Sequence, residues 1–131
     1  FGGTCVAGPD RLVKVAELLK KDMSEGNKLA VVLSAMGSTP EEPVKVTDQL
    51  LRAVGNAADR SDDYKADLER LEEMHIKAAM QLLGDEAGGL FEEYVEMLKE
   101  DIKNLKSMLK AVTIVGVSSS AFSDFVVGHG E

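Results

Sequence analysis

The segment LAVVLSA, residues 29–35, decides the fold class that this sequence predicts. It is a short, continuous apolar run ending in small residues, which is typical of a strand buried on both faces of a parallel sheet. Before it, a helix is predicted between Pro9 and Gly26, with its apolar face formed by Leu12, Val15, Ala16, Leu19 and Met23. The turn at Gly2 and Gly3 would follow a further strand upstream. This order predicts an α/β fold, in which sites gather at the carboxyl ends of strands.

The remainder of the chain is predicted to be helical. An exposed loop with two prolines spans residues 37–45, and a helix follows in which Thr47 is the expected N-cap. Two long amphipathic patterns, separated by the break GDEAGG at 84–89, predict an antiparallel helical hairpin over about residues 61–112. The final stretch, SSSAFSDFVVGHGE, predicts a short helix with serine caps. Its inward side chains are expected to be Phe122, Phe125 and Val126.

Length, charge and cysteine content exclude several classes of protein. With 131 residues, 44% of them hydrophobic, the chain suits one domain or part of one. Its net charge of −8 disfavours nucleic acid and anionic membranes as partners, and no apolar run approaches the roughly 18 residues of a membrane span. The single cysteine, Cys5, excludes an internal disulfide and a cysteine zinc site, and we expect it to be a small buried residue. His129 lies close to Glu131 in the sequence, but two residues do not make a metal site, so no metal ligand is predicted.

Candidate binding residues lie at the two ends of the chain and after the predicted strand. Gly2 and Gly3 offer backbone N–H groups without side chains, and Thr4 adds a hydroxyl, so the three could cradle a phosphate. They could equally form an ordinary glycine turn, and they match neither the G-x-G-x-x-G nor the G-K-[ST] pattern. Ser34 could face a ligand or serve as a turn residue. Glu131 follows a glycine at the end of the given sequence, so its carboxylate could approach a cationic group closely. Alternatively, it is simply a charge exposed to solvent.

His75 lies on an apolar helix face. A histidine in that position is more often a partly buried, hydrogen-bonded residue than a ligand, and we predict the former.

Several motifs resemble those of a known enzyme family. FGGTCV resembles the opening signature of the aspartate kinases, VVLSAM resembles their second-strand motif, and FSDFVVGHGE resembles their substrate-binding helix. The motifs GTCV, KVTD, DIKNLKSMLKAV and FSDFVVGHGE, in this order, are similar to the plant and algal bifunctional aspartokinase–homoserine dehydrogenases. The resemblance runs from Phe1 to Glu131.

The resemblance implies the amino-acid-kinase (carbamate-kinase-like) fold, represented by its N-terminal portion. It also implies transfer of the ATP γ-phosphoryl group to the β-carboxylate of L-aspartate, with Mg²⁺ bridging phosphate oxygens, to form 4-phospho-L-aspartate. The family pattern places Gly2–Thr4 at the ATP phosphates, Ser34 and Thr47 near the aspartate, and Glu131 at the aspartate ammonium group. The stretch GSTPEEPV looks like an insertion relative to the family, ahead of KVTD. If the alignment gap for this insertion is placed differently, Thr39 rather than Thr47 takes the place near the aspartate.

The resemblance carries further expectations about the whole protein. The family lysine would precede Phe1, while the adenine-binding half and a dehydrogenase that uses NADP(H) would follow Glu131. The 131-residue chain alone is therefore expected to lack kinase activity. The full protein is expected to form a homo-oligomer and to lie in the plastid of a photosynthetic eukaryote, or otherwise in the cytoplasm.

Two alternatives remain open on the sequence. A related kinase could act on glutamate, N-acetylglutamate, carbamate or UMP, although only a substrate with a free ammonium group needs the anion of Glu131. The hairpin at 61–112 could instead make the chain a non-catalytic helical interaction module.

Overall fold

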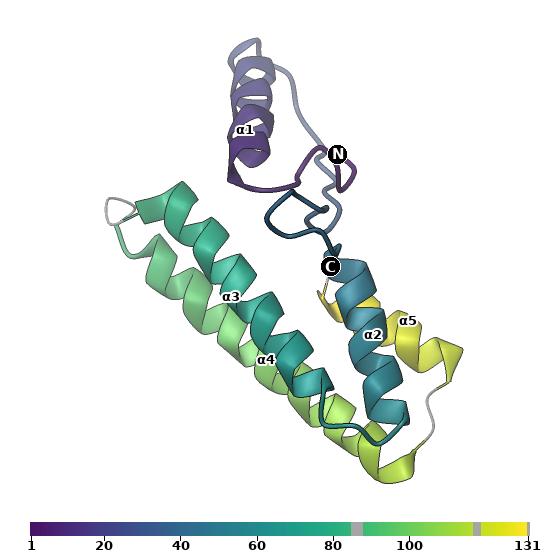
Figure 1. Cartoon of the computed structure of the whole chain (residues 1–131). Helices are drawn as coiled ribbons and strands as arrows, with labels where there is room; N and C mark the ends of the chain where they lie inside the picture. The colour runs from purple at the N-terminus through teal and green to yellow at the C-terminus, as the bar shows by residue number, and fades with distance from the viewer. Residues whose placement is uncertain (85–87, 117–118, 131) are drawn as a thin grey trace. The chain divides into compact units, whose positions relative to one another are not determined.

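A computed structural model describes residues 1–84, 88–116 and 119–130. The described residues form five helices and no strand, in the order α1 (Pro9–Ser24), α2 (Val46–Ala58), α3 (Tyr64–Leu83), α4 (Leu90–Val115) and α5 (Ser120–Gly130) (Figure 1). The chain divides into two compact units, Phe1–Lys45 and Val46–Glu131, which are described separately below. The helix-rich part of the prediction is therefore correct, but the predicted parallel sheet is not observed among these residues.

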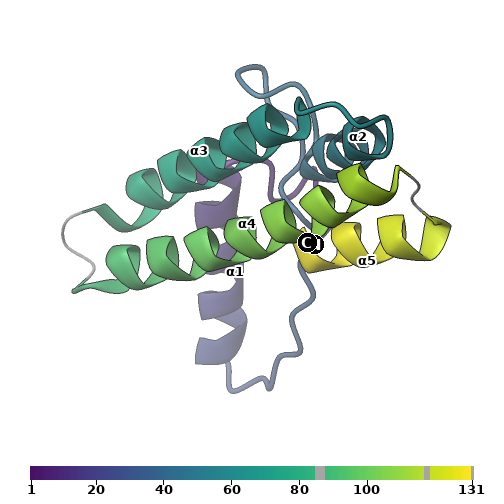
Figure 2. The same cartoon turned by 90° about the horizontal axis from the view of Figure 1, so that it is seen from below.

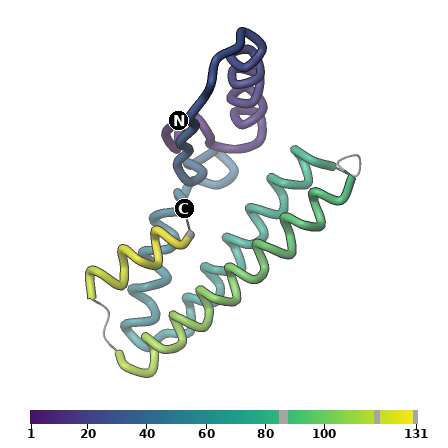
Figure 3. Tube along the Cα trace, turned by 180° about the vertical axis from the view of Figure 1, so that it is seen from behind, coloured from purple at the N-terminus to yellow at the C-terminus, as the bar shows by residue number. Residues whose placement is uncertain are grey.

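The second unit is a helical bundle built on the predicted hairpin. Helices α3 and α4 run side by side, and α2 contacts α3, α4 and α5 (Figures 1 and 2). The tube trace shows the same pairing of α3 with α4 from behind (Figure 3). Apolar residues at helical spacing meet in the centre: Val46, Leu50, Ala53, Val54, Ala57, Leu68, Leu71, Ile102, Leu105, Leu109, Val112 and Val126. Burial of these side chains drives the association of the helices.

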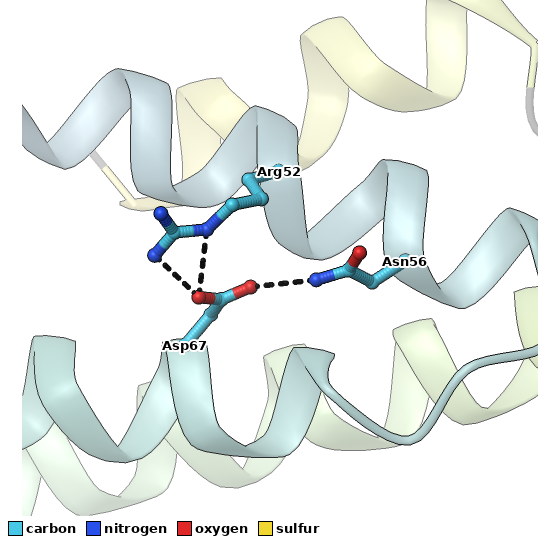
Figure 4. A network of polar contacts seen from close by, with 3 residues as sticks. All are labelled: Arg52, Asn56 and Asp67. Carbon is cyan, nitrogen blue, oxygen red and sulfur yellow. Dashed lines mark hydrogen bonds and ion pairs between the residues drawn. The ribbon is translucent and has the colours of Figure 1, made fainter.

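One buried carboxylate joins α2 to α3. Oδ1 of Asp67 accepts hydrogen bonds from Nε of Arg52 at 2.9 Å and from Nη2 of the same residue at 2.5 Å. Its other oxygen accepts one from Nδ2 of Asn56 at 3.0 Å (Figure 4). Asp67 is only 7% exposed, so these donors supply the hydrogen bonds that water would otherwise make.

The helix ends follow sequence signals in some places and depart from them in others. Oγ of Ser119 accepts a hydrogen bond from the backbone N–H of Phe122, as predicted for a serine cap of α5. Helix α4 ends at Gly116, whose φ of 76° is in the left-handed region. Thr47 is not an N-cap, because α2 already begins at Val46. The predicted break at 84–89 lies partly outside the described residues.

The first unit contains α1 and an extended segment, but not the strand predicted over residues 29–35. The ammonium nitrogen of Phe1 donates to the carbonyl of Val32 at 2.7 Å, and the N–H of Ser34 donates to the carbonyl of Phe1 at 3.0 Å. This is the bonding pattern of one parallel β pair. It does not continue into a ladder, because the next bond of this kind runs from Gly37 to Gly3. The segment is also exposed rather than buried on both faces, with Val32 79% accessible.

Two further burial predictions are wrong. Cys5 is exposed, and Phe125 is 58% exposed although it was expected to point inward with Val126, which is fully buried. Both residues lie in short segments, where spacing alone does not define which side meets the core. In the described part of the chain, no helix is both long and apolar enough to cross a membrane.

Candidate functional site

The glycine turn predicted to bind phosphate is a compact, hydrogen-bonded loop in the first unit. The N–H of Cys5 donates to the carbonyl of Gly2 at 2.7 Å, and the N–H of Val6 donates to the carbonyl of Gly3 at 3.2 Å. Val6 is 1% exposed and anchors the end of the turn. The turn leads into α1, where Gly8, with φ of 95°, precedes Pro9 at the first helical position.

The structure brings the predicted residues Gly2–Thr4 and the segment carrying Ser34 together. Ser34 bonds to the carbonyl of Phe1, immediately before the turn, and the N–H of Gly37 donates to the carbonyl of Gly3 at 3.1 Å. A Cβ atom at position 3 would lie 3.2 Å from the carbonyl oxygen of Ala35. The turn and residues 34–37 therefore pack backbone against backbone, and glycine permits this approach.

Three successive N–H groups of the turn remain available to a ligand. The amides of Gly2, Gly3 and Thr4 donate no hydrogen bond to any residue that the structure describes. A Cβ atom at position 37 would overlap the Gly3 carbonyl oxygen and lie 3.2 Å from the Thr4 nitrogen. Gly37 thus allows its backbone to approach the Gly3–Thr4 peptide closely. Consecutive unbonded N–H groups favour an anion. The sequence predicted only that Gly37 lies in a loop, because the residue pattern gives no sign of its contact with the backbone of Gly3.

The two threonines that are alternatives for contact with the aspartate, Thr39 and Thr47, lie in different surroundings. Thr39 uses its Oγ1 to accept a hydrogen bond from the N–H of Glu42 at 3.0 Å, which closes a small loop. Thr47 lies in the first turn of α2, in the second unit. Glu131, predicted to meet the substrate ammonium group, lies outside the described residues. Helix α5, which leads to it, is anchored by the buried Val126.

Helix α5 makes a second contact near its end. Nε2 of His129 lies 3.9 Å from Oδ1 of Asp101 on α4, a distance suited to an ion pair when the ring is protonated but too long for a direct hydrogen bond. The imidazole also stacks on Phe125, one helical turn earlier. These contacts hold the last described turn of α5.

A cavity of about 220 Å³ lies between the helices of the second unit, beside this contact. His75, Tyr94, Asp101 and His129 supply its polar atoms, and the remaining lining is apolar. His75 bonds through Nδ1 to the Leu71 carbonyl at 2.7 Å, and burial lowers its pKa, so the ring is neutral near pH 7. Burial also raises the pKa of Tyr94. The prediction of a satisfied, partly buried His75 is confirmed.

One residue that the sequence analysis did not single out contacts the turn. Nη1 of Arg11, in the first turns of α1, donates a hydrogen bond to the carbonyl of Thr4 at 2.9 Å. Arg11 lies seven positions after Thr4, across a loop that contains Gly8 and Pro9. No helical or strand periodicity spans such a loop, so the contact had no signal in the sequence.

Comparison with known proteins adds a relationship along the whole chain. All 131 residues align at 41% identity with the chloroplastic bifunctional aspartokinase/homoserine dehydrogenase 1 of Zea mays, and at 42% with its Arabidopsis thaliana counterpart. An aspartokinase of Candida albicans is 30% identical over the full chain, which covers 23% of that protein. The chain spans 13% of the length of the two plant relatives. No family model and no solved structure matches it significantly.

Proposed function

Because the chain belongs to the aspartokinase family along its whole length, we propose that it forms part of an aspartate kinase. The observation that carries the proposal is the glycine turn, in which three consecutive amides are available to an anion beside the Ser34 segment. Such a turn suits the phosphate groups of ATP.

In the proposed reaction, a β-carboxylate oxygen of L-aspartate attacks the γ-phosphorus of ATP. The new O–P bond forms as the bond from the γ-phosphorus to the β,γ-bridging oxygen breaks, and ADP leaves with that electron pair. No proton transfer is needed. Since both reactants are anions, the protein must hold them together against repulsion, and the amides of Gly2–Thr4 would do so on the phosphate side. Mg²⁺ bound together with ATP would neutralise further phosphate charge, and we assign it no protein ligand in this chain.

The remaining roles follow the family pattern. Ser34 and Thr47 would contact the aspartate, and Glu131 would pair with its ammonium group. The names of the plant relatives support two additions: a homoserine dehydrogenase in the same polypeptide, and a location in the plastid if the protein comes from a photosynthetic eukaryote. We further assign NADP(H) to that dehydrogenase as its coenzyme. We further propose a homo-oligomeric full-length protein, and no kinase activity for the 131-residue chain on its own.

The test of the function is acceptor specificity in the full-length protein. Purified protein with Mg²⁺ and ATP should form a hydroxylamine-trappable acyl phosphate with L-aspartate, and none with L-glutamate, N-acetyl-L-glutamate or carbamate. No phosphorylation of UMP should occur. A preference for any of these other acceptors would replace the aspartate assignment with a related kinase, and no activity with any acceptor would favour the helical interaction module.

The assignment of Glu131 gives a separate prediction. Glu131→Ala should raise the KM for aspartate about tenfold or more while changing the KM for ATP less than twofold, because a charge-assisted bond to an ammonium group contributes about 1.5–3 kcal/mol. Asp124→Ala, which removes an exposed carboxylate from helix α5, is the matched control and should change neither constant. Equal effects of Glu131→Ala on both KM values would remove the ammonium role.

A further inference from the structure

Arg11 bonds to the one carbonyl of the glycine turn that the backbone does not use. The carbonyl of Phe1 accepts from Ser34, that of Gly2 from Cys5, and that of Gly3 from both Val6 and Gly37. The carbonyl of Thr4 accepts only the guanidinium of Arg11 among the described residues. Every peptide group of the turn is thus held at its carbonyl end, and one of them is held by a side chain.

The rigidity of the peptide group connects these carbonyls to the available amides. Each carbonyl shares a plane with the N–H of the next residue, so a bond at the carbonyl orients that N–H. The bond from Ser34 to Phe1 therefore orients the amide of Gly2, and the bond from Gly37 to Gly3 orients the amide of Thr4.

The amide of Gly3 depends on Arg11 through one more link. Arg11 fixes the plane between Thr4 and Cys5, and the Cys5 N–H in that plane donates to the carbonyl of Gly2 at 2.7 Å. That carbonyl shares its plane with the N–H of Gly3. Removal of the guanidinium would free the Thr4–Cys5 peptide plane to rotate. The Gly2–Gly3 peptide plane could then rotate as well, because the glycines on both sides of it restrict the backbone little.

The positive charge of Arg11 also favours phosphate binding at the turn. Its side chain is exposed and has no acidic partner among the residues described, so none of their carboxylates neutralises its positive charge. A cation fixed beside the turn attracts phosphate over distances up to the Debye length. Its remaining N–H donors are not used in the described structure.

We propose that Arg11 is a positioning residue of the phosphate-binding turn, which holds the Thr4 carbonyl and thereby aims the Gly3 amide at a phosphate oxygen of ATP. This inference rests on the proposed function, because it requires that the turn binds the phosphates.

Hydrogen–deuterium exchange of the full-length protein tests the inference without relying on activity. With Mg²⁺ and ATP but no aspartate, the peptide that contains Gly2–Thr4 should become protected in the wild type. Arg11→Ala should need about five- to tenfold more ATP for the same protection, since it loses one partly exposed charge-assisted hydrogen bond. Arg11→Lys, which keeps a charged donor, should need less than Arg11→Ala. Lys14→Ala removes an exposed cation one turn further along α1 and should match the wild type.

Steady-state kinetics separates positioning from a general structural role. Arg11→Ala should raise the KM for ATP about five- to tenfold and leave kcat and the KM for aspartate within about twofold. A fall in kcat with an unchanged KM for ATP would show a structural role only and overturn the inference, as would unchanged protection. If the wild-type turn itself gains no protection from ATP, the phosphate role of the turn fails together with the role of Arg11. If Arg11→Ala does not fold, Arg11→Lys carries the same comparison.

Discussion

The carboxylate of Asp67 binds two side chains of the neighbouring helix, Arg52 and Asn56, at a position nearly closed to solvent. Asp67→Ala should lower the free energy of unfolding by about 1–2 kcal/mol, because it leaves those donors without their acceptor. The value stays at this low end because the Arg52 side chain is 44% exposed and can recover water. Urea denaturation of the full chain, followed by helical circular dichroism, gives the measurement.

Glu100→Ala is the matched control for that substitution. Glu100 forms an exposed i,i+3 pair with Lys103 on α4, and its loss should change stability by less than about 0.5 kcal/mol. Equal losses in the two variants would mean that the Asp67 contacts contribute no more than a surface ion pair.

At single residues, the sequence predicted the hydrogen-bonded, partly buried state of His75 from its place on an apolar helix face. Ser34 does lie beside the glycine turn, although the parallel sheet from which that proximity was expected is not observed among the described residues. The contributions of Arg11 and Gly37 could not be predicted, because each depends on a backbone atom that the loop brings close. Exposure of Cys5 was missed for a related reason: a turn has no periodic face from which burial can be inferred.

At the scale of the elements, two glycines of the second unit, one at the C-cap of a helix and one inside a helix, provide a paired test. Gly116 ends α4 with a φ of 76°, and an added Cβ would also approach Nε of Arg60 at 2.6 Å. Gly116→Ala should therefore destabilise the protein by about 1 kcal/mol. Gly55 lies inside α2, where a Cβ would meet open space, so Gly55→Ala should stabilise it by about 0.5–1 kcal/mol. Urea midpoints that shift in the same direction for both would contradict this account.

The helices were predictable and the strand was not, because the two kinds of element depend on different neighbours. A helix satisfies its hydrogen bonds within itself, so apolar spacing was enough to place α3 and α4. A strand makes its hydrogen bonds with a neighbouring strand, and the segment at 29–35 pairs only with Phe1 among the described residues. Its apolar composition indicated the right backbone shape, while burial and ladder formation depend on neighbours that the segment does not itself encode.

For the whole molecule, the partly buried His75 gives stability a dependence on pH. Burial lowers the pKa of His75 below its ordinary value of 6.5, so between the two values the unfolded chain binds a proton that the folded protein does not. The free energy of unfolding should thus be independent of this group above pH 6.5 and fall as the pH drops below it, by at most about 1.4 kcal/mol per pH unit. His75→Gln should remove this component. An identical pH profile in that variant, measured by urea denaturation between pH 5 and pH 8 (about the range in which histidine titrates), would contradict it.

The two units also differ in how much of their apolar surface the described residues cover. In the second unit, α2 to α5 enclose a continuous core, whereas in the first only Val6 and Val15 are buried apolar side chains.

The extended segment at residues 29–35 has a practical consequence for anyone who handles this chain. Its edge opposite Phe1, on which the N–H and carbonyl of Leu33 lie, has no hydrogen-bond partner among the described residues, and Val31, Val32 and Leu33 are all exposed. An uncharged, proline-free run with an open edge is a template for the addition of a second chain. Self-association and loss of soluble material in concentrated samples should therefore begin at this segment, and a lysine introduced at Val32 is the substitution best placed to suppress it.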